Sequence, residues 1–553
     1  MPIFVRAGTT AAILLCLALG CSQASAARGQ YTWHIAKTRW SEADEAGFER
    51  FVTAIGESDC SSSESCIRNK ANPYRRSDPR GFDVDLDCAK WPYFLRAYYA
   101  WKNRLPFSYV DAVSGHGDDL RYTKSPNRAV SRHDVVDHGH GIAGPAALRE
   151  LAATVYSATY RTDANERRGV LSDFYSPAIG PASIRPGTVI YDVNGHVGIV
   201  YKVDVDGRIY YMDAHPDFTV SRSVYGAQFG QSPERLGGGF KNWRPFRLLQ
   251  AHRDADGHLF GGHVVFAEND KIPDFSLVQY RGTQSNPTHR IKTARFAYKG
   301  IELGFYEYVR AAVSGGRMKY NPVFELRETM RSLCNDLKDR AQYVDQAIQE
   351  GYPDKPHPAR LPDNIYGTDD NEWETYSTPS RDARIKAGFV QFRKDMAEMI
   401  GMWIERDPRI VYDGQFLKDD LKKAYAEESQ ACTITYLSSD KRPVPMTLDT
   451  MIHRLFRMSF DPYDCIELRW GAGGDEARSC TDGRKKRAWY AAEQRLRNNP
   501  DRPYNLTMNF SLADLQEEKR GSGIDKAPDI DVRALIDGMG DQVPFAGMVP
   551  VGR

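Results

Sequence analysis

Three short β-rich runs constrain the fold of this chain more than any other feature of its sequence. Asn194-Gly195 and Asp206-Gly207 separate the runs, and dipeptides of this kind favour the tight turns of β-hairpins. The sequence therefore predicts three consecutive antiparallel strands in one sheet. The runs are TVIYDV at 188–193, HVGIVYKV at 196–203 and RIYYMDA at 208–214.

Helical periodicity divides the rest of the chain. Its 553 residues are too many for one ordinary hydrophobic core. Before about residue 315, helical patterns accompany the strands, and a Gly-rich polar stretch at 111–145 is typical of a loop insertion. We expect an α+β domain at 27–315 and a mostly α-helical domain at 316–553. Helices are predicted at 41–58, 88–102, 146–160, 324–348, 383–405, 416–431 and 485–497.

The first 26 residues have the pattern of an export signal. Arg6 precedes the apolar run at 11–21, and the small residues at 24–26 form a cleavage pattern. We expect cleavage after Ala26, with lipid attachment through Cys21 as the less favoured alternative. No later run is long and apolar enough to predict a transmembrane segment, so we expect a periplasmic or secreted protein.

The cysteine count separates one thiol from the others. Of the nine cysteines, Cys16 and Cys21 fall in the predicted signal, which leaves an odd number in an oxidising compartment. A local disulfide could close the loop from Cys60 to Cys66 and another the loop from Cys465 to Cys480, while Cys334 and Cys432 could bridge two helices. The connectivity does not follow from the sequence alone. This accounting favours a free Cys88.

The position of Cys88 suits a nucleophile. Asp87 is the expected N-cap of the helix at 88–102, so the sulfur would lie in the first helical turn. There the helix dipole favours a thiolate, and first-turn N–H groups can face an oxyanion. The negative charge of Asp87 opposes the thiolate unless its carboxylate turns to cap the helix. The alternative is that Cys88 is a buried packing residue.

A histidine and a carboxylate could complete a catalytic triad. His196 begins the second predicted strand, and Asp213 lies on the third, so a hairpin would bring them within reach of each other. Asp213 could then orient the imidazole, and His215 could replace Asp213 in that role. The alternative for His196 is a satisfied, partly buried histidine.

Two segments resemble the NlpC-like papain-fold cell-wall peptidases and amidases. LDCAKWPYFLRAYY, which contains Cys88, is similar to the DCSG-type helix start of that superfamily, and RPGTVIYDVNGHVGIVYKV resembles its strand pair. The resemblance implies a papain-like core in which Cys88 is the nucleophile, His196 the general base and Asp213 the third polar residue. NPYRRSDPRGFD is similar to the upstream approach of the family, which would make Tyr74 an oxyanion-side candidate. Ala89-Lys90 replaces the usual Ser-Gly, so the substrate does not follow from the resemblance.

These features predict an exported cysteine hydrolase that cleaves an amide bond in a peptide or peptidoglycan-like substrate. One alternative is a non-catalytic envelope or secreted binding module on the same fold, and a weaker one is a transglutaminase-type acyl transferase. The formal net charge of +1 gives no support for a nucleic-acid partner. We expect no cofactor and no metal, although HDVVDHGHG at 133–141 offers residues that could bind zinc. The oligomeric state is left open.

Overall fold

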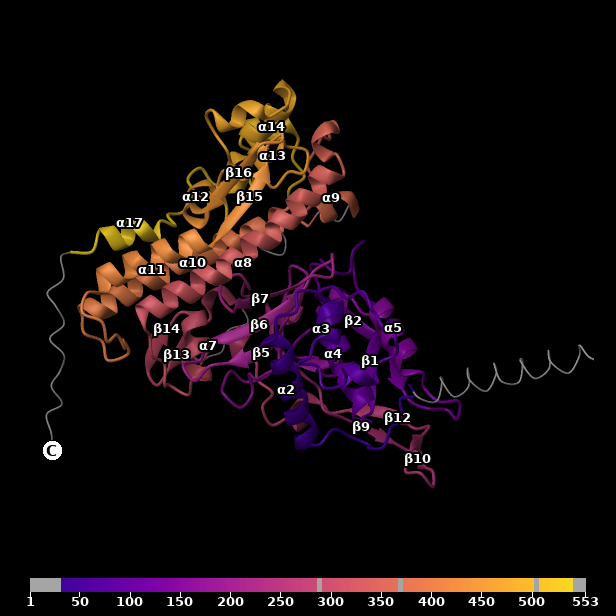
Figure 1. Ribbon diagram of the computed structural model, residues 1–553. Helices are drawn as coiled ribbons and strands as arrows, with labels where there is room; N and C mark the ends of the chain where they lie inside the picture. Colours follow the sequence, from indigo (N-terminus) through magenta and orange to yellow (C-terminus); the bar gives the residue numbers. More distant parts are fainter. Residues whose placement is uncertain (1–30, 286–290, 367–370, 502–506, 541–553) are drawn as a thin grey trace, which may run out of the picture.

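The protein is an α+β molecule with small antiparallel sheets, as a computed structural model shows (Figure 1). The structure describes residues 31–285, 291–366, 371–501 and 507–540. The predicted signal peptide at 1–26, with Cys21, lies outside the described residues. Within those residues, no helix combines the length and the apolar character that crossing a membrane would need.

A six-stranded antiparallel sheet is the centre of the first half. Its strand order is β3-β8-β4-β5-β6-β7, and the predicted meander is confirmed as its β4-β5-β6 portion. Asp192 pairs with His196 across the β4–β5 turn, where Gly195 has a φ of 87°, a value that a glycine adopts without strain. The strands are β3 (Phe174–Tyr175), β4 (Val189–Asp192), β5 (His196–Val203), β6 (Ile209–Ala214), β7 (Val220–Val224) and β8 (Gly239–Trp243).

Helices α2 and α4 share a hydrophobic core with one face of this sheet. Val189, Val197 and Ile199 contribute to that core from the sheet, together with the aromatic residues of α4. Ser41 and Asp44 form a capping box at the start of α2, because each side chain satisfies an N–H group of the other residue. The helices of this region are α2 (Glu42–Gly56), α3 (Ser63–Arg68), α4 (Lys90–Lys102) and α5 (Gly144–Thr154).

The stretch predicted as a loop insertion contains an antiparallel ribbon, so that expectation at 111–145 is corrected. Strands β1 (Phe107–Ser114) and β2 (Arg128–Val135) pair with each other, with a register shift near Ala112. The first four residues of β1 are buried, but its second half and most of β2 are exposed or only partly buried, and this obscured the alternation from which a strand is recognised.

Smaller elements complete the first half. Helix α7 packs on the second face of the six-stranded sheet, in a core with Ile190, Val200 and Tyr211. These elements are β9 (Phe246–Leu249), β10 (His252–Arg253), β11 (Leu259–Phe260), β12 (His263–Phe266), α6 (Val278–Arg281), β13 (Phe296–Tyr298), β14 (Ile301–Leu303) and α7 (Phe305–Val313).

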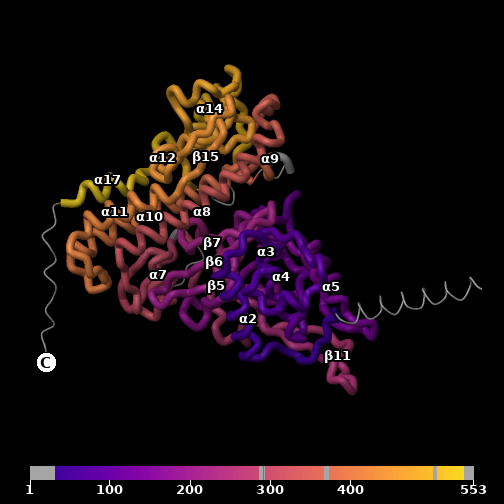
Figure 2. The backbone as a smooth tube through the Cα atoms, viewed as in Figure 1, coloured from indigo at the N-terminus to yellow at the C-terminus, as the bar shows by residue number. Residues whose placement is uncertain are grey.

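The three long helices of the second half, α8, α10 and α11, run side by side, as Figures 1 and 2 show. They share one hydrophobic core and confirm three of the predicted helices. A short hairpin, β15 with β16, was not predicted. The elements are α8 (Pro322–Gln349), α9 (Asn371–Tyr376), α10 (Pro379–Ile404), α11 (Leu417–Ala431), β15 (Thr433–Leu437), β16 (Pro443–Thr447), α12 (Leu448–Arg454), α13 (Ile466–Arg469), α14 (Arg484–Ala492), α15 (Gln494–Asn498), α16 (Leu512–Gln516) and α17 (Val532–Asp537).

The two halves are joined along the edge of the six-stranded sheet. Ser332 of α8 accepts a hydrogen bond from the backbone N–H of Val224, and Asn335 donates to the carbonyl of Arg222 on the same edge strand. Glu325 of α8 also pairs with Arg208 and Arg310 from the first half. The helical half therefore covers the edge that β7 would otherwise expose.

The disulfide pattern agrees with the cysteine accounting. Cys60 bonds to Cys66, Cys334 to Cys432, and Cys465 to Cys480. Among the described cysteines, Cys88 alone is free.

Candidate active site

Cys88 lies in a turn immediately before α4. The carboxylate of Asp87 accepts hydrogen bonds from the N–H groups of Ala89 (3.0 Å) and Lys90 (3.1 Å), and its second oxygen lies 2.8 Å from the Lys90 ammonium. The hydroxyl of Tyr160 donates to the carbonyl of Ala89 at 2.6 Å and holds the turn from the other side. Asp87 therefore holds the turn that leads into α4, but the helix begins at Lys90 with Ala89 as its N-cap, so the prediction of Asp87 as the N-cap is corrected.

The sulfur of Cys88 faces the turn between β4 and β5. Its Sγ lies 3.8 Å from the carbonyl oxygen of Gly195, and the backbone N–H of Val197 also donates to it. These two residues flank His196 in the chain. Among the described residues, no hydrogen bond joins Sγ to the His196 ring.

Strand alternation explains why no hydrogen bond joins the ring and the sulfur among the described residues. The side chains of Val197 and Ile199 face the core shared with α4, whereas His196 and Asp213 belong to the opposite face of the sheet. Cys88 precedes α4 and packs against the first core. The sulfur and the imidazole therefore approach each other only around the end of the sheet, at the β4–β5 turn.

His196 and Asp213 form a close pair. The Nε2 atom of His196 lies 2.8 Å from Oδ2 of Asp213, and the other carboxylate oxygen accepts a 2.7 Å hydrogen bond from Ser221. Because an ionised carboxylate only accepts, Nε2 carries the proton and Nδ1 keeps its lone pair. The predicted orientation of His196 by Asp213 is present in the structure.

The charge states of these three groups follow from their surroundings. Burial, followed by the negative charge of Asp87, raises the pKa of the Cys88 thiol to about 12. Burial, followed by the charge of Arg384, lowers the pKa of His196 to about 4. Burial opposes ionisation of Asp213, yet His215 and the hydrogen bonds from His196 and Ser221 hold its pKa below the usual range. At neutral pH the thiol and the imidazole are both uncharged.

His215 lies beside the pair and extends it toward the second half. Its Nε2 atom is 3.1 Å from the Ser221 hydroxyl, 3.3 Å from Asp339 and 3.9 Å from Asp213. Burial alone would lower the pKa of His215, but the carboxylates of Asp213 and Asp339 raise it. These carboxylates therefore favour the cationic form of His215, and Asp213 rather than His215 contacts Nε2 of His196.

Helices α8 and α10 supply residues that the sequence analysis missed. Asp336 and Asp339 from α8, with Arg381 and Arg384 from α10, line a pocket with His196 and Asp213. The cavity volume is about 30 Å³, which is room for one or two water molecules. Each pair has the i, i+3 spacing of one helix face, and this was the available signal. It does not identify which other element that face contacts.

The N–H groups of the Cys88 turn are unequally occupied. Ala89 and Lys90 donate to the Asp87 carboxylate, and Trp91 donates to the Asp87 carbonyl. The backbone N–H of Cys88 donates to no atom in the described parts of the chain. It is therefore the group of this turn that remains available for an oxyanion.

Tyr74 does not contribute to this site, so its accessory role is corrected. Its hydroxyl exchanges hydrogen bonds with Asn103, which follows α4, and its ring packs on Tyr98 and Tyr99. Cys88 lies at the opposite end of the helix. The upstream motif that resembles the family therefore serves packing here.

An aromatic pair covers the β4–β5 turn. Tyr122, from the loop between β1 and β2, lies so close to Gly195 that an added Cβ would meet its ring at 3.1 Å. Tyr122 stacks on Tyr366 of the second half at a centroid distance of 4.5 Å, and neighbouring Arg121 pairs with Glu374 at 2.6 Å. We call Tyr122 with Tyr366 the tyrosine cover.

The stretch 133–141 does not form a metal cluster. The Asp137 carboxylate accepts hydrogen bonds from the backbone N–H groups of Gly139, His140 and Gly141, and His133 packs on Tyr109. The His/Cys/Asp/Glu groups close enough to hold an ion in the described chain lie elsewhere. Comparison with protein-family models, with curated proteins and with solved structures found no match.

Proposed function

We propose that the protein is an exported cysteine hydrolase that cleaves an amide bond. The observation that carries the proposal is the 2.8 Å pairing of His196 with Asp213. Gly195 and Val197, the chain neighbours of His196, contact the free thiol of Cys88. This arrangement provides a nucleophile, a base with its tautomer fixed, and an orienting carboxylate in papain-like chain order.

The charge states favour general-base catalysis over a preformed thiolate–imidazolium pair. As the Cys88 sulfur attacks the amide carbonyl carbon, Nδ1 of His196 takes the thiol proton, and Asp213 stabilises the resulting imidazolium. The Cys88 N–H donates to the oxyanion. His196 then returns the proton to the leaving amine. Water next attacks the thioester, with His196 as base, and the carboxylic acid and the free thiol are released.

This chemistry requires two movements. The imidazole and the sulfur must approach each other around the end of the sheet, since the hydrogen bond between them is not made in the described structure. The tyrosine cover must also separate from Gly195, because Tyr122 packs against the turn around which the sulfur and the imidazole would meet. Catalytic hydrogen bonds often tighten only when substrate binds.

The substrate class is proposed as a peptide of peptidoglycan type, by resemblance alone, and the location as periplasmic or secreted. Three disulfides support an oxidising compartment.

The second candidate function is a non-catalytic binding module. The raised pKa of the thiol and the placement of His196 on the sheet face away from α4 favour it. In that case the thiol would have no faster reaction with electrophiles than an ordinary buried cysteine.

The deciding experiment labels the protein with a thiol-reactive, amide-mimicking probe and digests peptidoglycan in parallel. Cys88→Ala should abolish both labelling and the change in muropeptides. His196→Ala should abolish turnover, and His263→Ala, a matched change of an exposed histidine on β12, should leave it intact. Equal labelling of wild type and Cys88→Ala, with unchanged muropeptides, would contradict the hydrolase proposal. Incorporation of an added amine would indicate acyl transfer instead.

A further inference from the structure

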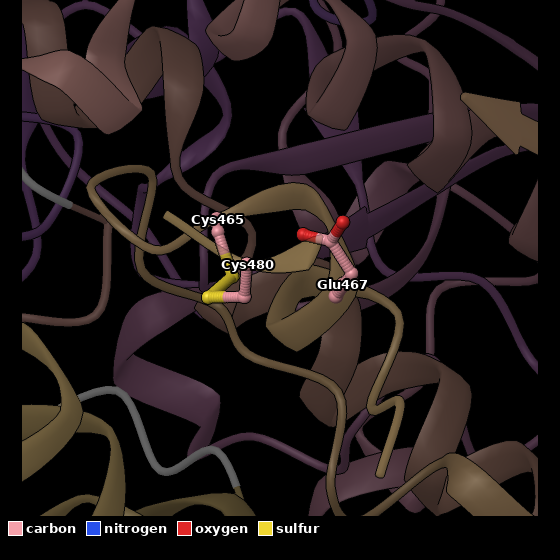
Figure 3. Close-up of side chains that lie close together, drawn as sticks. All are labelled: Cys465, Glu467 and Cys480. Atoms are coloured by element: carbon pink, nitrogen blue, oxygen red, sulfur yellow. A yellow bond between two sulfur atoms is a disulfide. The ribbon is translucent and has the colours of Figure 1, made fainter. Parts of the chain in front are cut away.

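Two groups of side chains in the described second half come close enough to hold a metal ion, but in one of them the two cysteines form a disulfide. Cys465, Glu467 and Cys480 form the first group, but Figure 3 shows the two sulfurs joined as a disulfide. The Glu467 carboxylate accepts hydrogen bonds from Ser439 and Ser479. This group therefore has no free ligand set.

The second group is built from three segments that are distant in the sequence. His357 follows α8, Asp461 lies between α12 and α13, and Glu493 lies at the junction of α14 and α15. One ligand atom from each side chain lies within 4.8 Å of the other two. The side chains of His357 and Asp461 and the residue Glu493 are all 0% exposed.

The hydrogen bonds of His357 fix which ring nitrogen is available. Nδ1 lies 2.7 Å from the carbonyl oxygen of Pro358, so Nδ1 must carry a proton, because a carbonyl oxygen only accepts. The ring also stacks on Trp489 at a centroid distance of 4.0 Å, which holds its plane. Nε2 lies 2.7 Å from Oδ2 of Asp461 in a hydrogen bond, and a metal bound by both residues would take the place of the proton between them. An outer hydrogen bond from Nδ1–H to a carbonyl is the usual support of a metal-binding histidine.

Asp461 accepts from the backbone N–H of Tyr463 and contacts His357, but two neighbouring carboxylates, Glu493 and Asp464, lack such donors in the described chain. Both side-chain oxygens of Glu493 and both of Asp464 are buried without a partner among the described residues. Arg497 comes within 3.6 Å of Glu493, and Arg469 acts on Asp461 and Asp464 electrostatically, but neither arginine donates a hydrogen bond to these oxygens. Buried carboxylates are normally paired or bound to a metal.

We propose that His357, Asp461 and Glu493 bind a divalent transition metal of the zinc class, with Asp464 as a neighbouring carboxylate. An imidazole ligand argues against Ca²⁺ and Mg²⁺, which prefer oxygen, and suits zinc together with carboxylates. Ligand atoms around a tetrahedral zinc lie about 3.4 Å apart, so His357 and Asp461 need to separate only slightly. The ion ties together three segments of the second half. This inference is independent of the proposed hydrolase activity and departs from the expectation of no metal.

The test measures zinc uptake by the full chain after removal of metals with a chelator. We expect about one zinc per chain for wild type, and at least about tenfold weaker binding for His357→Gln and Glu493→Gln. His453→Gln is the matched control, because His453 is an exposed histidine of the same half beside Asp449. It should bind zinc like wild type.

Thermal unfolding keeps the test decisive if a variant folds poorly. Zinc should raise the midpoint of wild type and of His453→Gln by several degrees, and Ca²⁺ at the same concentration should not. The proposal is overturned if metal-free wild type takes up no zinc, if Glu493→Gln binds it equally well, or if Ca²⁺ displaces it. It is also overturned if neither protein takes up zinc and Glu493→Gln is more stable than wild type. Bound protons, rather than a metal, would then neutralise the buried carboxylates.

Discussion

Replacing Asp213 by asparagine tests the proposed reaction through the tautomer of His196. Oδ1 of Asp213 accepts from the Ser221 hydroxyl, and Ser221 in turn contacts His215. His215 is held as a donor by Asp339 at 3.3 Å. These hydrogen bonds fix the orientation of an asparagine at position 213. Its carbonyl oxygen would face Ser221, and its NH₂ group would face His196.

The consequence is an imidazole with its proton on the wrong nitrogen. An NH₂ group in place of Oδ2 requires Nε2 of His196 to accept, so the proton moves to Nδ1 and the ring cannot take the thiol proton. For a triad this error costs about 10³- to 10⁴-fold in kcat, or about 4 to 5.5 kcal/mol of transition-state stabilisation. The substitution preserves shape, so binding of substrate should change much less than turnover.

The assay is single-turnover hydrolysis of an amide substrate identified by the peptidoglycan digestion, with thermal unfolding measured on the same samples. A second variant sharpens it. Adding Ser221→Ala to Asp213→Asn frees the amide to turn over, so part of the lost rate should return. Asp213→Asn with activity near that of wild type, or a double variant no faster than the single one, would refute the tautomer argument.

Three further results are expected. First, because the folded-state pKa of His196 is lowered to about 4, its neutral form stabilises the fold above pH 6.5. That contribution, at most about 3 kcal/mol, is lost as the pH falls from 6.5 to 4. His215 has the opposite sign, so comparing urea unfolding of wild type and His196→Asn over this range isolates the contribution, and parallel curves would contradict it. Second, Tyr366→Ala should speed iodoacetamide labelling of Cys88 by about 2- to 10-fold, since stacked rings contribute about 0.5–1.5 kcal/mol; an unchanged rate would mean that the tyrosine cover does not limit access. Third, replacing Cys334 and Cys432 together by alanine should lower the free energy of unfolding by up to about 4.7 kcal/mol, against about 3 kcal/mol for the pair Cys465 and Cys480. The difference arises because the first bond spans 98 residues and the second 15, and equal losses in denaturant unfolding would contradict the loop-length argument.

Local chemistry made part of this structure predictable. The strands on either side of Asn194-Gly195 were predicted because the turn itself determines how its neighbours pair. Counting cysteines identified Cys88 as the free thiol, since pairing by proximity in the chain accounted for the short loops. The hydrogen bonds of Asp87 at the start of α4 were predictable only in part, because its carboxylate holds the preceding turn while Ala89 is the N-cap.

Long-range placement was not predictable in the same way. Asp339 and Arg384 approach the site from helices that follow it by more than a hundred residues, and helical spacing shows that they share a face without showing what that face meets. Tyr74 was misplaced for the same reason, because a motif fixes order along the chain and not the end of α4 that the residue reaches. The exposed part of the β1–β2 ribbon lacked the apolar alternation that would have predicted it.

The second half of the chain determines the charge state of the candidate site as well as its shape. Arg384 of α10 disfavours protonation of His196, and Asp339 of α8 favours a cationic His215, which in turn keeps Asp213 ionised. In the proposed reaction, the residues that resemble the papain-fold family would supply the reacting atoms, and residues outside that resemblance would determine their protonation states. A thiol, a histidine and a carboxylate placed in the right order are not sufficient for catalysis, because the same three groups with different protonation have no base. For this protein, the proposed chemistry would therefore depend on the helices after residue 316 as much as on the strands that carry His196 and Asp213.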